Sequence, residues 1–289
     1  MKRISLLGLL WVVFLVACEK QPIPEPQNPP TPQEKTLHLS CSGGIVIDAQ
    51  TGNVLYNHHA EVLLVPASMT KVMTMYIVFE QMEKGYMDIN TVIPISDYAA
   101  QRSVNPGESN VPLSQTDTYT VNELIGALCV VSGNACAVAL GEYISKGTES
   151  DFATIMNHYA DSLGLDADYV DASGLASGNI ISPKSQAALT RDFIRRFPLI
   201  LSYTSKKSLL FHGETYYATN GLLPGQTYAY NGCDGFKTGY TGAAGLCITA
   251  TAQLGGKRVI AVVMKAPDSA SRYKDAATLM DYGFTKLLE

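Results

Sequence analysis

Ser68-Met-Thr-Lys71 is the stretch of this 289-residue chain that says most about its fold and its chemistry. Two further strings, Ser132-Gly-Asn134 and Lys237-Thr-Gly239, follow it in that order. The three strings supply a hydroxyl nucleophile with its own lysine base, a hydroxyl–amide pair and a basic strand edge. Those groups are needed to attack a carbonyl and form an acyl-enzyme. Each string alone is a common pattern, since Ser271-Arg-Tyr-Lys274 repeats the first and Ser177-Gly-Asn179 the second. Their order and wide spacing therefore carry the prediction.

The first string places its two reactive groups together. Ser68 follows Pro66-Ala67 and is expected to open a helix, where unpaired amides and the positive end of the helix dipole point outward. Lys71 comes three residues later, on the same face and within reach of the hydroxyl. The dipole disfavours a charged lysine in the first turn, as burial would, and a lowered pKa makes the amine a usable base. The alternative is a serine N-cap beside a solvated lysine.

Strand patterns stand at both ends of the chain, with helix patterns between them. Gly44–Asp48 and Asn53–Tyr56 flank the turn Gln50-Thr-Gly52 and predict a hairpin. A helix with one apolar face is predicted by the spacing of Val72, Met75, Tyr76, Phe79 and Met82. Further helices are predicted at Val121–Ser132, Ala135–Ile144, Asp151–Leu163, Lys184–Phe197 and Ala270–Leu288, and further strands at Leu209–Phe211, Gly235–Thr238, Leu246–Ala252 and Val259–Met264.

The hairpin cannot bury its face alone. The economical solution joins it to the late strands in one antiparallel sheet, with the first and last helices packed on it. This arrangement predicts an α/β fold of the α+β kind. The segment Tyr98–Pro112, which contains Pro106-Gly107, is expected to form a loop at the rim of the site.

The N-terminus has the pattern of an export signal. Lys2 and Arg3 precede an apolar run, Ile4–Ala17, that is too short for a comfortable membrane span. The run closes Leu15-Val-Ala-Cys18, which resembles the lipobox of bacterial lipoproteins and implies lipidation of Cys18. We therefore expect a signal peptide at 1–17, a lipidated cysteine and Pro-rich linker at 18–36, and a catalytic domain at 37–289. A plain signal peptide or an uncleaved anchor is the alternative.

Charge and cysteine content narrow the function further. A net charge of −5 argues against nucleic acid as a partner and against a polybasic membrane-surface patch. Besides Cys18 there are five cysteines, an odd number without metal-ligand spacing, so no metal or other cofactor is expected. Five buried thiols are favoured over a Cys233–Cys247 bridge. The five are Cys41, Cys129, Cys136, Cys233 and Cys247.

As a set, the motifs resemble those of the D-alanyl-D-alanine carboxypeptidases, the low-molecular-weight penicillin-binding proteins of serine peptidase family S11. The resemblance covers about 37–289. It implies a β-lactamase/transpeptidase-like fold, with an antiparallel sheet flanked by helices and a helical subdomain at about 72–200. The supporting stretches are Ile45–Gly52, Pro66–Lys71, Val130–Asn134, Asn220–Leu223, Gly235–Thr241, Ala244-Gly245 and Tyr282–Phe284.

The resemblance also implies roles for the site residues. Ser68 would attack the penultimate D-alanine carbonyl with Lys71 as its base. Ser132 and Lys237 would relay a proton to the departing D-alanine, and Asn134 would hold the substrate amide and Lys71.

Substrate binding is implied at a second group of residues. The backbone amides of Ser68 and Tyr240 would form the oxyanion hole. Thr238 and Arg272 would receive the terminal carboxylate, and Gly239 would let the strand backbone approach the ligand. Many members of the family carry an arginine where this chain has Thr219, and an aspartate where it has Ala135.

The implied partners are the D-Ala-D-Ala end of a peptidoglycan stem peptide, β-lactams as inhibitors, and a membrane reached through the N-terminal lipid. The implied location is the extracytoplasmic face of a bacterial envelope. Three alternatives stay open: a serine β-lactamase, a D,D-endopeptidase, and a non-catalytic peptidoglycan-binding lipoprotein. The commonest β-lactamases need a Glu-x-x-x-Asn setting between the second and third strings, which none of Glu142, Glu149 and Glu214 provides.

Overall fold

The described part of the computed structural model comprises residues 36–289. The predicted signal peptide at 1–17, the predicted lipidation site Cys18 and all but the last residue of the predicted linker lie outside it. Within residues 36–289 no helix is long and apolar enough to cross a membrane.

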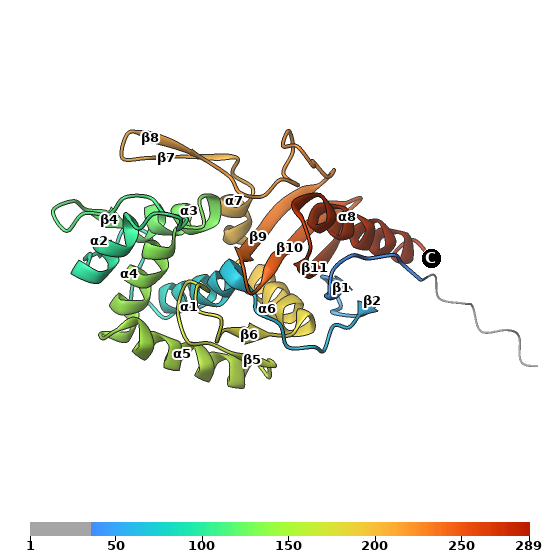
Figure 1. Cartoon of the computed structure of the whole chain (residues 1–289), viewed down its shortest axis with the longest axis horizontal. Coiled ribbons are helices and arrows are strands. Elements are labelled where there is room, and N and C mark those ends of the chain that lie inside the picture. The colour runs from blue at the N-terminus through green and yellow to red at the C-terminus, as the bar shows by residue number, and fades with distance from the viewer. Residues whose placement is uncertain (1–35) are drawn as a thin grey trace, which may run out of the picture. The chain divides into compact units, whose positions relative to one another are not determined.

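The N-terminal hairpin joins the late strands in one sheet, which confirms the sequence prediction. The sheet is antiparallel and five-stranded, in the order β2-β1-β11-β10-β9 (Figure 1). All six residues of β1 are buried because neighbouring strands and helices cover both of its faces. The strands are β1 (Gly43–Asp48), β2 (Val54–His58), β9 (Cys233–Thr241), β10 (Gly245–Leu254) and β11 (Lys257–Ala266).

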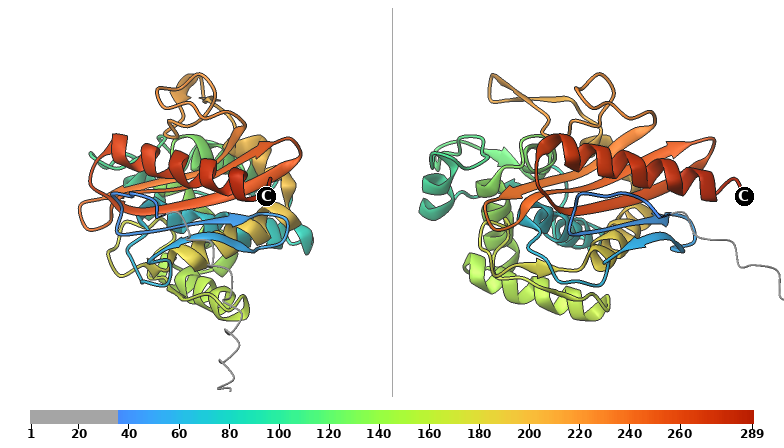
Figure 2. Two further views of the ribbon diagram at one scale, coloured as in Figure 1. Left: turned by 90° about the vertical axis from the view of Figure 1, so that its right-hand side faces the viewer. Right: turned by 45° about the vertical axis from the view of Figure 1, so that its right-hand side comes forward.

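Two helices cover the two faces of the sheet (Figure 2). A Cβ on Gly43 would touch Pro183 at the start of α6 (Pro183–Arg196), and a Cβ on Gly44 would touch Leu279 of α8 (Ser269–Lys286). Successive residues of a strand point to opposite faces. Helices α6 and α8 therefore pack on opposite sides of β1, and both also contact β10 and β11.

The first helix differs from the prediction in its surroundings. Helix α1 (Lys71–Glu83) is buried at every position from Lys71 to Glu80, and so has no solvent-exposed face along that stretch. It packs among α4 (Asn134–Ser145), α5 (Glu149–Ser162) and α6. The contacts of this part of the chain with strands β9 and β10 are made mainly by the 3-10 turn that precedes α1, η1 (Ala67–Thr70). Helix α6, rather than α1, packs on the face of the sheet opposite to α8.

The other predicted helices are confirmed, and several short elements were missed. Helix α3 (Val121–Val130) begins at a capping box in which the Thr120 hydroxyl and the Glu123 carboxylate satisfy each other's backbone amides. The missed elements are α2 (Asp97–Ser103), η2 (Pro198–Ile200), α7 (Leu201–Thr204), the strand pairs β3 (Val92–Ile93) with β4 (Tyr119–Thr120) and β5 (Ala167–Asp168) with β6 (Ile180–Ile181), and β8 (Glu214–Tyr217), which pairs with the predicted strand β7 (Ser208–Phe211).

The segment Tyr98–Pro112 is only partly a loop. Its first residues belong to α2 because the Ser96 hydroxyl caps that helix, accepting a hydrogen bond from the Ala99 amide at 3.0 Å. Its remainder, from Val104 onward, is irregular and reaches the site described below, as predicted.

The five cysteines of the described chain are all buried free thiols. Cys233 lies opposite Ala252, and Cys247 lies opposite Gly239, in the pairing of β9 with β10. The prediction of buried thiols is confirmed, and Cys233 and Cys247 are not bridged.

Candidate active site

Ser68 lies in the 3-10 turn η1, where the backbone is held in an unusual conformation. The preceding residue, Ala67, has a left-handed backbone with φ 50°. Strand β9 packs closely against the same turn. A Cβ added to Gly239 would come within 2.6 Å of the Pro66 carbonyl oxygen and 3.2 Å of the Ser68 nitrogen. Glycine at 239 therefore permits the close approach, and the strained turn presents the hydroxyl beside the edge of the sheet.

Lys71 has three partners around its amine nitrogen. The nitrogen lies 3.0 Å from the Ser68 hydroxyl, 2.6 Å from Oδ1 of Asn134 and 2.6 Å from the backbone carbonyl of Ser173. The side chain is fully buried. Burial, aided by the positive charge of Lys237, lowers the pKa of Lys71 well below its ordinary value. The alternative of a serine N-cap beside a solvated lysine is therefore wrong, and Pro66 is the residue before η1.

The partners of Lys71 decide where its lone pair points. A neutral amine has two N–H donors and one lone pair. The carbonyl oxygens of Asn134 and Ser173 are acceptors only, so they take the two N–H groups. When Lys71 is protonated, its third N–H donates to the Ser68 oxygen; when it is neutral, its lone pair faces the O–H of Ser68, which is the arrangement a general base needs.

Ser132 and Lys237 form a second serine–lysine pair, and Ser132 lines the same pocket as Ser68. Lys237 on β9 donates to the Ser132 hydroxyl at 2.8 Å and to the Thr238 carbonyl at 3.0 Å. Burial lowers the pKa of Lys237 to about 7. Ser132 has a left-handed backbone, φ 67°, between α3 and α4, which turns its hydroxyl toward β9.

A pocket of about 210 Å³ brings the predicted site residues together. Lys71 and Lys237 lie buried behind its wall. The lining residues are Ser68, Gly107, Glu108, Ser109, Ser132, Asn134, Leu175, Thr219, Thr238, Gly239, Tyr240 and Arg272. Of the predicted site, only Cys18 falls outside the described residues.

Arg272 lies at one end of this pocket with unused donor capacity. Its Nη2 donates to the Tyr273 hydroxyl at 2.7 Å, and its buried Nε has no hydrogen-bond partner within the described chain. Nearby, the hydroxyls of Thr219 and Thr238 are 2.7 Å apart. This end of the pocket offers a guanidinium and two hydroxyls, a set suited to a carboxylate.

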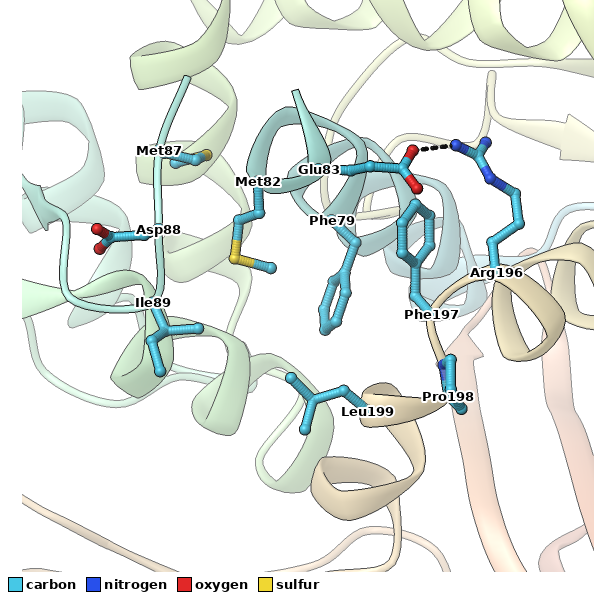
Figure 3. A pocket seen from close by; sticks show the side chains of 10 residues that line it. All are labelled: Phe79, Met82, Glu83, Met87, Asp88, Ile89, Arg196, Phe197, Pro198 and Leu199. Carbon is cyan, nitrogen blue, oxygen red and sulfur yellow. Dashed lines mark hydrogen bonds and ion pairs between the residues drawn. The ribbon is translucent and has the colours of Figure 1, made fainter. Parts of the chain in front are cut away.

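A second pocket, at the far end of α1, is larger, at about 480 Å³, but lacks such chemistry (Figure 3). Figure 3 shows Phe79, Met82 and Leu199 turned toward it, with an ion pair between Glu83 and Arg196 at its edge. None of its lining residues is a serine or a lysine. In the described part of the chain no cluster of histidine, cysteine or carboxylate side chains could hold a metal ion.

Comparison with known proteins agrees with this geometry. The family profile described as D-alanyl-D-alanine carboxypeptidase, peptidase S11, matches residues 30–268. The chain belongs to the D-alanyl-D-alanine carboxypeptidase family. It is 33% identical to DacF of Bacillus subtilis (strain 168), over 86% of this chain, and 34% identical to DacD of Escherichia coli (strain K12), over 88%. It spans 64% and 65% of the length of these two relatives, just under two thirds.

Solved structures of the family share the fold. The peptidoglycan synthesis regulatory factor PBP3 from Streptococcus pneumoniae superposes with a TM-score of 0.81 at 33% identity, covering 86% of this chain and 72% of that one. Penicillin-binding protein D2 from Listeria monocytogenes, in its ampicillin-bound form, gives 0.76 at 30% identity, covering 87% and 100%. The predicted fold class is confirmed.

Several residues that support this family site were not found from the sequence. The buried Asp171 carboxylate accepts backbone N–H groups from Ser173, Gly174 and Ala176, which shapes the loop that aims the Ser173 carbonyl at Lys71. The Asp-Ala-Ser-Gly string at 171–174 is a turn signal that could have flagged this loop. Glu108 was also missed, although the loop that carries it was expected at the rim.

Proposed function

We propose that this chain is a serine-type D-Ala-D-Ala carboxypeptidase, which removes the terminal D-alanine from peptidoglycan stem peptides through an acyl-enzyme and is inhibited by β-lactams. One observation carries the proposal. The Lys71 amine touches the Ser68 hydroxyl at 3.0 Å while both of its other partners are carbonyl oxygens. A binding module needs no buried amine held against a hydroxyl, whereas an acylating serine does.

Acylation begins at Ser68. Its oxygen attacks the carbonyl carbon of the penultimate D-alanine as Lys71 takes the hydroxyl proton. The negative charge on the substrate oxygen is stabilised by the backbone N–H groups of Ser68 and Tyr240. The close approach of Gly239 to the Ser68 nitrogen supports this role, since it brings β9 beside η1.

The leaving D-alanine is then protonated and released. Ser132 donates its proton to the departing amine and is reprotonated by Lys237, to which it is hydrogen-bonded. The terminal carboxylate binds between the Thr238 hydroxyl and the Arg272 guanidinium, since both residues line the pocket. Water next attacks the ester carbonyl: its hydroxyl group ends on the shortened peptide, Ser68 regains its proton from Lys71, and the remaining water proton restores Lys237. With a β-lactam the ring-opened acyl group stays on Ser68.

The proposed location is the extracytoplasmic side of a bacterial envelope, with a lipid on Cys18 as the anchor. The export-like N-terminus and the Leu15-Val-Ala-Cys18 string support it. Metabolic labelling with palmitate tests it: the wild-type chain is expected to take up label and Cys18→Ser to take up none. Equal labelling of the two proteins contradicts the anchor.

The activity is tested by labelling with a fluorescent penicillin and by release of D-alanine from a peptide ending in D-Ala-D-Ala. We expect one label per wild-type molecule and none on Ser68→Ala, with a matching loss of D-alanine release. Rapid repeated turnover of nitrocefin supports a β-lactamase instead, and exclusive cleavage of cross-linked muropeptides supports an endopeptidase. A wild-type protein that neither labels nor releases D-alanine contradicts the proposal.

A further inference from the structure

Glu108 lies in the wall of the pocket and has no role in the steps above. We propose that Glu108 is a positioning residue, which fixes the side-chain amide of Asn134 so that its oxygen faces Lys71. This inference rests on the proposed function of the site. It concerns a carboxylate contributed by the loop after α2, more than twenty residues before Asn134 along the chain.

The loop that carries Glu108 is attached to the start of α4. The Asn134 side-chain amide donates to Oε2 of Glu108 at 3.0 Å. The backbone N–H of Asn134 donates to the Ser109 carbonyl at 2.9 Å, and that of Ala135 donates to Oδ1 of Asn110 at 2.8 Å. Three consecutive loop residues therefore hold the first turn of α4, and of these three only Glu108 bonds the Asn134 side chain.

The contact fixes which way the amide is turned. An asparagine amide has an oxygen that accepts and an NH2 group that donates, and a rotation of 180° exchanges them. A carboxylate only accepts, so it selects the NH2 group and leaves the oxygen for Lys71, at 2.6 Å. In the rotated form an N–H group would face the Lys71 amine. The amine lone pair would then accept that hydrogen bond and no longer be available to Ser68.

Glu108 is itself held in place as an ionised acceptor. Its carboxylate receives Nε and Nη2 of Arg102, at 3.3 and 3.0 Å, and Nδ2 of Asn105, at 3.1 Å. Partial burial raises the pKa of Glu108, but these hydrogen bonds and the one from Asn134 outweigh it and leave the pKa below its ordinary value. Every hydrogen-bond partner of the Glu108 carboxylate is a donor. If the Asn134 amide rotated, its oxygen would face the carboxylate, and two acceptors would meet without a hydrogen bond between them.

The test measures the second-order rate constant of acylation by a fluorescent penicillin against pH, counted per labelled site. The variants are Glu108→Ala, which removes the acceptor, and Glu108→Gln, whose amide oxygen can replace it. Glu142→Ala is the control, because Glu142 is another hydrogen-bonded glutamate of the same helical region, bonded to Ser96, and is not among the residues that line the pocket. Thermal unfolding of each variant is recorded in parallel.

We expect Glu108→Ala to lower the plateau of the rate by about ten- to a hundredfold, the factor associated with a hydrogen bond to a charged group. The acidic limb should also move to lower pH, because Arg102 keeps only Glu149, at 3.6 Å, as an ion-pair partner and disfavours protonated Lys71 more strongly. Glu108→Gln should keep most of the plateau, and Glu142→Ala should match the wild type. The charged or titratable groups that act on Lys71 are Lys237, Asp171, Cys136 and Arg102.

Three outcomes overturn the inference: an unchanged plateau in Glu108→Ala, equal losses in Glu108→Ala and Glu108→Gln, or a loss confined to the number of labelled sites. The side-chain amide resonance of Asn134 gives a reading independent of activity. It should shift in Glu108→Ala and stay near its wild-type position in Glu108→Gln. If wild type does not label, the proposed function fails, and this resonance still decides whether Glu108 orients the amide.

Discussion

The amine of Lys237 lies 2.8 Å from the hydroxyl of Ser132, a residue 105 positions earlier in the chain. The pair repeats the chemistry of Ser68 and Lys71, which are only three residues apart. Both lysines are buried, and neither forms an ion pair with a carboxylate within residues 36–289. Two positive charges in one buried site repel each other, so the two amines are suited to different tasks, one as a base and one as a proton donor.

Lys71→Arg tests the requirement for a neutral amine. An arginine keeps the length and hydrogen-bonding capacity of the side chain but stays protonated at every accessible pH. We expect the acylation rate by a fluorescent penicillin to fall by roughly 10³-fold or more, at neutral and alkaline pH alike. In the wild type the rate should rise with pH as Lys71 loses its proton. Recovery of the arginine variant at high pH would contradict a base role for Lys71.

Lys237→Met tests the electrostatic cost of burying the second lysine. The folded-state pKa of Lys237 is about 7, against 10.5 for an ordinary lysine. Between these values the folded protein binds fewer protons than the unfolded chain, so the free energy of unfolding gained from this group rises with pH. The stability of Lys237→Met relative to wild type should therefore fall by roughly 4 kcal/mol between pH 7 and about pH 10.

The measurement is urea unfolding of both proteins across that pH range. The difference between them is used because the buried thiols of Cys41, Cys136, Cys233 and Cys247, whose pKa values are raised by causes other than Lys237, contribute to both proteins alike. A pH-independent difference contradicts the lowered pKa of Lys237.

Gly174→Ala tests how tightly the loop under Lys71 is packed. Gly174 has φ 84°, and an added Cβ would overlap the carbonyl oxygen of Ala67, next to the nucleophile. We expect a loss of about 3 kcal/mol in the free energy of unfolding, together with slower acylation, because η1 must move. Gly164→Ala is the matched control, with φ 64° and no atom within 4 Å of the added Cβ. It should cost about 1 kcal/mol and leave acylation unchanged. Equal effects of the two substitutions contradict this packing argument.

Thr219→Arg tests the end of the pocket that should receive the carboxylate. The hydroxyl of Thr219 lies 2.7 Å from that of Thr238, and the family resemblance predicts an arginine at this position. A guanidinium at 219 should lower the KM for a peptide ending in a free D-alanine carboxylate by about tenfold, the factor of a charge-assisted hydrogen bond. The same peptide ending in a primary amide is the control and should change little. An equal change for both peptides places the carboxylate elsewhere.

The sheet and the main helices could be predicted because their signals are local. The hairpin at 43–58 and the three late strands are short segments bounded by turn residues, most of them apolar, and a lone hairpin must find partners. The short pairs β3–β4 and β5–β6 could not be predicted, since two residues per strand carry no periodicity. Helix α1 was read as amphipathic because its apolar spacing is regular, yet α4, α5 and α6 enclose it.

The sequence by itself determined the reactive groups, their order and the family, because residue types at fixed spacings within each string are visible without coordinates. Only the tertiary structure decided the protonation and orientation of those groups. Burial lowers the lysine pKa values, the Ser173 carbonyl uses one Lys71 N–H, and Glu108 turns the Asn134 amide. These effects depend on desolvation and on hydrogen bonds between distant segments, which arise only when the chain is packed.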